Sequence, residues 1–192
     1  YHVCHISCRE SVELIREAKK SGVNVTCETA PHYLLLCEDD LREDGFFKMN
    51  PPLRGREDRE ALLEGLFDGT VDMIATDHAP HSAEEKSRGL EKSLMGVTGL
   101  EVSFPMLYTE LVKKGYLSLE RLIFLMSEAP RKRFSIGSDR GFAVWDLSGE
   151  REVDPASFLS QGHATPFIGR RVSATCLLTV YKGRPVYKRG RA

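Results

Sequence analysis

The chain has 192 residues, of which 41% are hydrophobic and 29% charged, a composition typical of a globular protein with a substantial core. Its formal net charge of −1 gives no electrostatic argument for binding nucleic acid or an anionic membrane surface. No apolar run approaches the roughly 20 residues that a membrane-spanning helix needs, so we expect a small-molecule substrate, no nucleic acid and no membrane.

The N-terminal segment begins at Tyr1 without the basic and apolar stretches of a secretory signal, and directly inside an apolar, strand-like sequence. We therefore expect a piece of a longer chain. The cysteines contain no C-x-x-C pair and are expected to be free thiols in a reducing, cytoplasmic environment; they are Cys4, Cys8, Cys27, Cys37 and Cys176.

The first part of the chain alternates apolar strands with amphipathic helices. The expected strands cover residues 1–5, 23–29 and 71–76, and the expected helices cover 11–20 and 57–67. The sequence Ser7-Cys8-Arg9-Glu10 has the form of a capping box before the first helix. Residues 40–50 should be irregular. Near-continuous apolar strands that alternate with helices indicate a parallel sheet covered by helices, so the fold class is α/β.

The second part begins with an expected polar loop at 82–94. Two helices should follow at 99–114 and 118–127, and short strands at 142–147, 172–180 and 185–187. This change of texture predicts a domain boundary after residue 136, which divides the chain into domains 1–136 and 137–192.

An aspartate and two histidines follow the third expected strand. Asp77, His78 and His81 lie where a parallel strand meets its loop, which is where such sheets build active sites. These residue types suit metal binding or proton transfer, although an Asx turn with exposed histidines is the alternative. His5 ends the first strand in the same way and could bind zinc or be a hydrogen-bonded core histidine.

The segment from Lys48 to Arg54 forms a second polar candidate. Asn50 offers a donor and an acceptor, and Arg54 a fork for a carboxylate, while a structural turn before the two prolines is an equally good interpretation. For His32 we favour a supporting or structural role, and we expect nothing catalytic from His163.

Five motifs together resemble class I dihydroorotases of the amidohydrolase superfamily, in the order found in that family. They are His5-Ile6-Ser7, Glu28-Thr29-Ala30-Pro31-His32, Met49-Asn50-Pro51-Pro52-Leu53-Arg54, Ala75-Thr76-Asp77-His78-Ala79-Pro80-His81 and Thr165-Pro166-Phe167-Ile168-Gly169. The resemblance implies the C-terminal part of a (β/α)8 TIM barrel, with strands six to eight, followed by a small β-sandwich segment.

The resemblance also implies roles for individual residues. His5 and Asp77 would bind zinc, and Asp77 would also be the catalytic acid and base. Asn50 and His81 would hold the substrate, as would Met95 and Gly96 through their backbone, although methionine replaces the family's phenylalanine. The implied reaction is the reversible conversion of N-carbamoyl-L-aspartate to L-dihydroorotate in pyrimidine biosynthesis.

The family's other metal ligands have no counterpart in these residues. His5 and Asp77 alone cannot complete a binuclear zinc site, because each zinc takes about four ligands. The chain alone is therefore expected to be inactive. The alternatives are a dihydropyrimidinase or allantoinase, and a non-catalytic scaffold subunit of aspartate transcarbamoylase. A homodimer or a complex with that enzyme would be the expected assembly.

Overall fold

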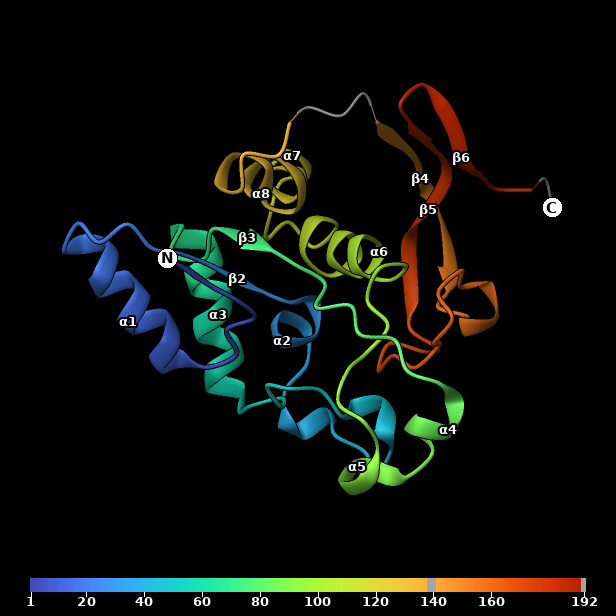
Figure 1. Ribbon diagram of the computed structural model, residues 1–192, viewed down its shortest axis with the longest axis horizontal. Coiled ribbons are helices and arrows are strands. Elements are labelled where there is room, and N and C mark those ends of the chain that lie inside the picture. The colour runs from blue at the N-terminus through green and yellow to red at the C-terminus, as the bar shows by residue number, and fades with distance from the viewer. Residues whose placement is uncertain (138–140, 191–192) are drawn as a thin grey trace.

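Two separate sheets organise the computed structural model, which describes residues 1–137 and 141–190 (Figure 1). The first is parallel and contains, in spatial order, β1 (His2–Val3), β2 (Thr26–Thr29) and β3 (Met73–Ile74). The second is antiparallel and contains β4 (Phe142–Glu152), β5 (Arg171–Tyr181) and β6 (Arg184–Lys188). Every strand expected from the sequence is present, those of the first sheet shorter than expected. The predicted domain boundary immediately precedes residues 138–140, which lie outside the described residues.

Helices α1 (Arg9–Lys20) and α3 (Arg56–Asp68) connect the parallel strands and pack against each other. The predicted capping box of α1 is wrong. Cys8 occupies the N-cap position and its side chain caps nothing. Instead the backbone N–H of Arg9 donates to Asp58 Oδ1 at 2.9 Å. A carboxylate of α3 therefore satisfies a free donor of α1, which only the tertiary contact makes possible.

The α1–α3 contact depends on a glycine. A Cβ atom added to Gly65 would lie 2.9 Å from Val12 Cγ1 and 3.2 Å from Val71 Cγ2, so a side chain there would push the helices apart. Val12 is fully buried in this contact. At the rim, Arg16 Nη2 binds Asp68 Oδ2 at 2.7 Å. Close backbone approach at one small residue thus fixes how the two helices lie.

Short helical turns occupy segments for which we predicted no helix. They are α2 (Pro31–Leu35), α4 (Ala83–Lys86), α5 (Gly89–Lys92) and the 3-10 turns Glu38–Asp40 and Gly45–Phe47. The polar loop predicted at 82–94 is therefore wrong in detail. Helix α4 forms there because of a capping box. Ser82 Oγ accepts from the Glu85 N–H at 3.2 Å, and Glu85 Oε2 accepts from the Ser82 N–H at 2.8 Å.

The two helices expected after residue 98 are present with different bounds: the first is shorter than expected and the second is longer. Helix α6 (Ser103–Leu107) starts four residues later than expected and continues as a π-helical turn to Val112. Helix α7 (Leu119–Ile123) continues through a second π-helical turn into α8 (Ala129–Arg133), beyond the expected end. Its start agrees with the sequence, because Ser118 Oγ caps the Arg121 N–H at 3.1 Å.

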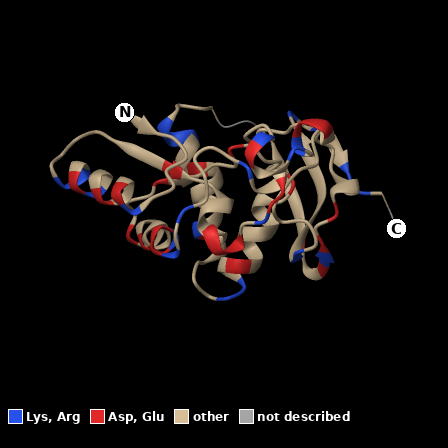
Figure 2. Cartoon of the chain, turned by 90° about the horizontal axis from the view of Figure 1, so that it is seen from below, with Lys and Arg blue, Asp and Glu red and all other residues tan. Residues whose placement is uncertain are grey.

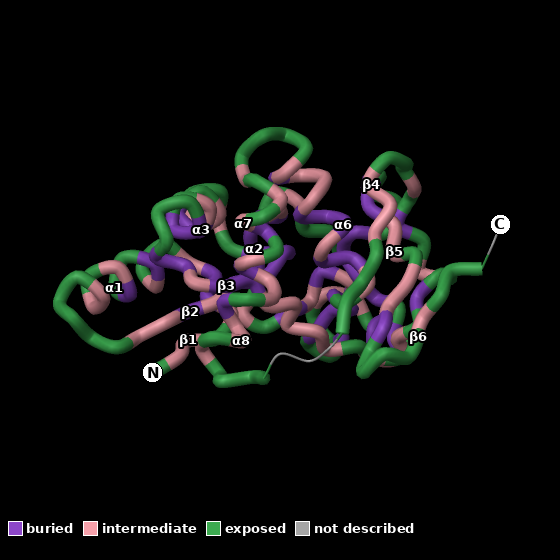
Figure 3. Tube along the Cα trace, turned by 90° about the horizontal axis from the view of Figure 1, so that it is seen from above, coloured by how far each residue is buried: buried purple, intermediate pink, exposed green. Residues whose placement is uncertain are grey.

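One hydrophobic core joins the two sheets. It runs from the α1–α3 layer through α6 to side chains between and beside the antiparallel strands, among them Val153, Phe167 and Val172 (Figure 3). Acidic and basic side chains are interspersed on the outer elements, as on α1 (Figure 2). Within the described ranges, no helix combines the length and apolar character that crossing a membrane requires. The five cysteines are free, as expected.

Candidate active site

The carboxyl ends of the three parallel strands meet at one edge of the sheet. The Ile6 N–H donates to Glu28 O at 2.9 Å, and the Ala75 N–H to Thr29 O at 3.0 Å. Thr29 Oγ1 also donates to Ile6 O at 2.8 Å and is completely buried. These hydrogen bonds keep the three strands in register at their carboxyl ends, so the segments that follow all begin at the same edge of the sheet.

His5 and Asp77 share an unusual backbone conformation at this edge. Their φ angles are +40° and +47°, in the left-handed region that residues other than glycine seldom adopt. Such strained residues cluster at functional sites, where the surrounding structure holds them in place. The two residues that the sequence singled out at separate strand ends are thus also conformational outliers.

Two buried imidazole nitrogens near this edge have no hydrogen-bond partner among the residues that the structure describes. They are Nδ1 of His5 and Nε2 of His32. Burial, and secondly the neighbouring His5, lower the pKa of His32 to about 3, so this imidazole is neutral at neutral pH. Neutral imidazole with a free lone pair is the form that binds metal. His32, in α2, is therefore near enough to His5 for the two imidazoles to interact electrostatically.

The charge of Asp77 affects the pKa of two groups that follow the other two strands, Tyr33 in α2 and Cys4 after β1. Burial raises the pKa of the Tyr33 hydroxyl, and the charge of Asp77 raises it further. Burial, then Glu28 and then Asp77 raise the pKa of the Cys4 thiol. The Tyr33 hydroxyl donates to Pro51 O at 2.7 Å. Tyr33 thus connects the surroundings of Asp77 with the loop that carries Asn50.

His81, Met95 and Gly96 lie together. His81 Nε2 is 2.9 Å from Met95 O, and His81 Nδ1 is 3.5 Å from Glu85 Oε2. Gly96 has a φ of +140°, and a Cβ atom added there would lie 3.1 Å from His81 Nε2 and 2.6 Å from Ala79 Cβ. The sequence predictions for these three residues therefore converge on one turn.

The loop with Asn50 packs against that turn. The Gly96 N–H donates to Lys48 O at 2.9 Å, two residues before Asn50. The Asn50 side chain is exposed and free to meet a ligand. Arg54 is also exposed, and its carbonyl accepts from the Glu38 N–H at 2.8 Å. The structure thus brings the loop that carries Asn50 to the turn that carries Met95 and Gly96.

His78 has a structural role. Its Nδ1 accepts from the backbone N–H groups of Gly99 and Leu100 at 3.1 and 3.3 Å, so its proton lies on Nε2, which faces Ser160 Oγ at 3.4 Å. These contacts join the loop after β3 to the segment before α6 and to the C-terminal part. His163 is exposed on the surface.

One set of three metal-ligating side chains occurs within residues 1–137 and 141–190, and it excludes both His5 and Asp77. It comprises His2, Cys4 and Glu28, whose ligand atoms lie within 4.8 Å of one another. The His2 ring nitrogens are already engaged, by Thr26 Oγ1 at 2.8 Å and Glu28 Oε2 at 3.2 Å. The His2 and Glu28 side chains are therefore already hydrogen-bonded to each other across β1 and β2.

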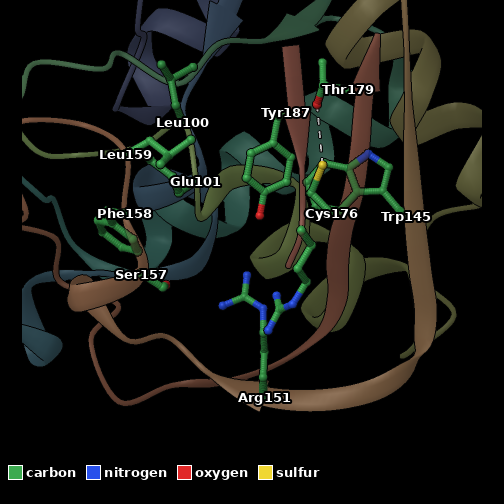
Figure 4. Close-up of a pocket in the computed structure, with 11 residues that line it drawn as sticks. Leu100, Glu101, Trp145, Arg151, Ser157, Phe158, Leu159, Cys176, Thr179 and Tyr187 are labelled. Atoms are coloured by element: carbon green, nitrogen blue, oxygen red, sulfur yellow. Dashed lines mark hydrogen bonds between the residues drawn. The ribbon is translucent and has the colours of Figure 1, made fainter. Parts of the chain in front are cut away.

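A cavity of about 290 Å³ lies away from the strand ends, beside the antiparallel sheet (Figure 4). Trp145, Cys176 and Tyr187 line it from β4, β5 and β6, opposite Leu100 and Glu101. None of the expected site residues contributes to its wall. The candidate site is therefore the strand-end edge and not this cavity.

Zinc fits the chemistry of this edge. The His5 imidazole has a buried nitrogen without a partner, and Asp77 supplies a carboxylate. Nitrogen and carboxylate oxygen are both preferred zinc ligands. Since zinc takes about four ligands, these two side chains make part of a site rather than a whole one.

Curated proteins named as dihydroorotases are similar in sequence to this chain. No established family profile matches the chain. The dihydroorotase of Bacillus cereus strain AH820 is 50% identical to it over 197 residues, which cover 98% of this chain and 46% of the relative. The dihydroorotase of Bacillus cytotoxicus matches with the same identity and coverage. Over nearly its whole length the chain is similar to these dihydroorotases. It spans about half the length of the curated relatives it matches.

Solved structures place the fold among cyclic amidases. The L-hydantoinase (dihydropyrimidinase) of Arthrobacter aurescens superposes with a TM-score of 0.90 at 36% identity, over 99% of this chain and 45% of that one. The dihydropyrimidinase of Brevibacillus agri superposes with a TM-score of 0.88 at 26% identity, over 97% and 44%. The likeness confirms the α/β class and the resemblance of this chain to TIM-barrel amidohydrolases.

Proposed function

We propose that this chain forms part of a zinc-dependent dihydroorotase, which interconverts N-carbamoyl-L-aspartate and L-dihydroorotate. The observation that supports this most is the placement of His5 and Asp77 after the two outer strands of the parallel sheet, at one edge. Both are in the left-handed conformation, and His5 Nδ1 is buried without a partner among the described residues. The 50% identity to Bacillus dihydroorotases supports the choice of reaction.

In this proposal His5 and Asp77 would hold zinc together with further ligands that lie outside these 192 residues. Zinc, when bound, lowers the pKa of water and polarises the amide carbonyl. The Asp77 carboxylate takes a proton from the attacking water and gives it to the departing ring nitrogen, which makes it the general base and then the general acid. The neighbouring Tyr33 keeps its proton, because burial and Asp77 raise its pKa.

Substrate contacts come from the turn beside the site. Asn50 and His81 bind the polar groups and carboxylate of the substrate, and Met95 and Gly96 offer their backbone. The contacts of Gly96 with Lys48 and of His81 with Met95 support this assignment, because they join the turn to the loop that carries Asn50. Holding the substrate in this way fixes the direction of attack.

Finer features of the fold belong to the same proposal. β1 to β3 would be barrel strands six to eight, and β4 to β6 part of a β-sandwich, with domains at 1–136 and 137–192. The separation of the two sheets supports this division. The free cysteines support a cytoplasmic location.

A dihydropyrimidinase-type amidase is the second candidate. It is favoured by the structural likeness to the Arthrobacter aurescens L-hydantoinase, at a TM-score of 0.90. An acidic substrate needs polar partners, so Asn50 and His81 favour dihydroorotate. The deciding experiment assays the complete protein on dihydroorotate, dihydrouracil and allantoin, with zinc measured in the same sample. Turnover of dihydrouracil alone would refute the dihydroorotase assignment, and a protein without zinc and without turnover would indicate a scaffold subunit.

A further inference from the structure

Lys86, the last residue of α4, is buried although it carries a charge. Its side chain is 1% exposed. The ammonium donates three hydrogen bonds, to Lys48 O at 3.0 Å, Leu94 O at 2.8 Å and Gly96 O at 2.7 Å. All three partners are backbone carbonyls, and no carboxylate pairs with this lysine among the described residues. The three N–H donors of the ammonium are thereby all used inside the protein.

The three carbonyls come from the two segments that form the substrate turn. Lys48 leads into the loop with Asn50, and Leu94 and Gly96 flank Met95 on both sides. Lys48 O accepts from both Lys86 Nζ and the Gly96 N–H, at 3.0 and 2.9 Å. The ammonium therefore lies where the loop and the turn join, and its bonds hold both at once.

Helix α4, which ends at Lys86, also contacts His81. The Leu94 N–H donates to Glu85 O at 3.2 Å, and Glu85 Oε2 is 3.5 Å from His81 Nδ1. The capping box at Ser82 fixes the first turn of this helix. The position of Lys86 is thus set by the same short helix that contacts the His81 ring.

A buried charge is expensive unless its hydrogen bonds replace those to water. Three carbonyl oxygens directed at one point would repel one another without a cation between them, and bonds from an ionised donor are about twice as strong as neutral ones. An apolar side chain could fill the same space but could not hold the carbonyls together. The charge therefore determines the relative position of the two segments.

We propose that Lys86 is a positioning residue for substrate binding: it holds the Leu94–Gly96 turn against the Lys48–Asn50 loop, so that Asn50, His81 and the Met95–Gly96 backbone face the same ligand. The inference rests on the proposed function, since these four residues are its substrate contacts. Lys86 itself does not touch the substrate, because its donors are all occupied by carbonyls.

The test is Lys86→Met in the complete protein, with Lys92→Met as the matched control. Lys92 lies on the neighbouring α5 and is exposed, so its replacement removes one charge without disturbing a buried contact. We expect KM for dihydroorotate to rise about tenfold or more in Lys86→Met, with kcat within about threefold and zinc content unchanged, the pattern of lost binding without lost chemistry. Lys92→Met should match the wild type.

Lys86→Arg is the second variant, because it keeps the charge and donor groups without the compact geometry of an ammonium. Its KM should lie between those of the wild type and Lys86→Met. An unchanged KM in Lys86→Met overturns the proposal, as does a loss confined to kcat or zinc. If Lys86→Met does not fold, an unchanged KM in Lys86→Arg overturns it, and so does failure of both variants to fold.

Failure of the proposed function gives a different result. If the wild type hydrolyses dihydrouracil and not dihydroorotate, the dihydroorotase assignment is refuted. The KM comparison on dihydrouracil then still decides whether Lys86 positions the turn.

Discussion

Replacing Gly96 with alanine should lower both the stability of the protein and its affinity for substrate. At a φ of +140° a side chain is rarely accommodated, which costs about 1–3 kcal/mol. The new Cβ would also lie 2.6 Å from Ala79 Cβ and Ala79 O, and relief of such overpacking costs about 1–3 kcal/mol more. The two effects together predict a loss of about 2–6 kcal/mol.

Gly115→Ala separates these two effects. Gly115 also has a positive φ, +78°, but no atom lies within 4 Å of an added Cβ. Its replacement should therefore cost only the backbone term of about 1–2 kcal/mol. Urea unfolding of both variants gives the comparison, and substrate titration gives KM. The reasoning fails if Gly96→Ala is no more destabilising than Gly115→Ala, or if its KM equals that of the wild type, since the new methyl group would lie 3.1 Å from His81 Nε2.

Three further predictions concern the site and the core. Asp77→Asn should lower kcat about 10²–10⁴-fold, because the amide cannot carry the proton; steady-state assays measure it, and activity within tenfold of the wild type would contradict the assigned role. Leu62→Ala should destabilise the protein by about 2–5 kcal/mol in urea unfolding, because Leu62 is fully buried, and a smaller loss would mean that the core collapses around the gap. Burial lowers the pKa of Lys86 from 10.5 to about 8, against the opposing charge of Asp44. Between those pH values the unfolded chain binds more protons, so the unfolding free energy of the wild type should rise with pH relative to Lys86→Met, and a constant difference would refute the burial argument.

The parallel sheet could be predicted from the sequence because its signals are local. Apolar runs bounded by glycine or polar residues gave the order of strands and helices, and the structure confirms it. The start of α1 could not be predicted, because its cap is Asp58, 49 residues away. The turn at Ala83–Lys86 is different. Ser82 and Glu85 form the same S-x-x-E motif as Ser7 and Glu10, but of these two motifs only the one at Ser82 makes a capping box. A capping motif thus identifies a possible helix start, and tertiary contacts decide whether it is used.

The site divides in a similar way. His5 and Asp77 were predictable, since each directly follows an apolar strand and parallel strands end at one edge. Lys86 was not, because a lysine in the polar sequence Glu84-Glu85-Lys86-Ser87 is typical of an exposed surface. One of the carbonyls that bind its ammonium in the interior is Lys48 O, which lies 38 residues earlier in the chain. Backbone carbonyls leave no trace in a sequence, so a cation that they surround cannot be recognised from residue types.

The left-handed conformation of His5 and Asp77 connects fold with chemistry. In a regular strand successive side chains alternate between the two faces of the sheet, so a residue at a strand end would simply take the face that its position dictates. A φ near +40° or +47° interrupts that alternation at both strand ends. Histidine and aspartate tolerate this region better than most residues, yet it still costs free energy that the packing beneath must offset. The buried bonds among Ile6, Glu28 and Thr29 hold the strand ends rigid directly below. The same strands that supply the core therefore also hold the two candidate ligands in a conformation that they would not adopt by themselves.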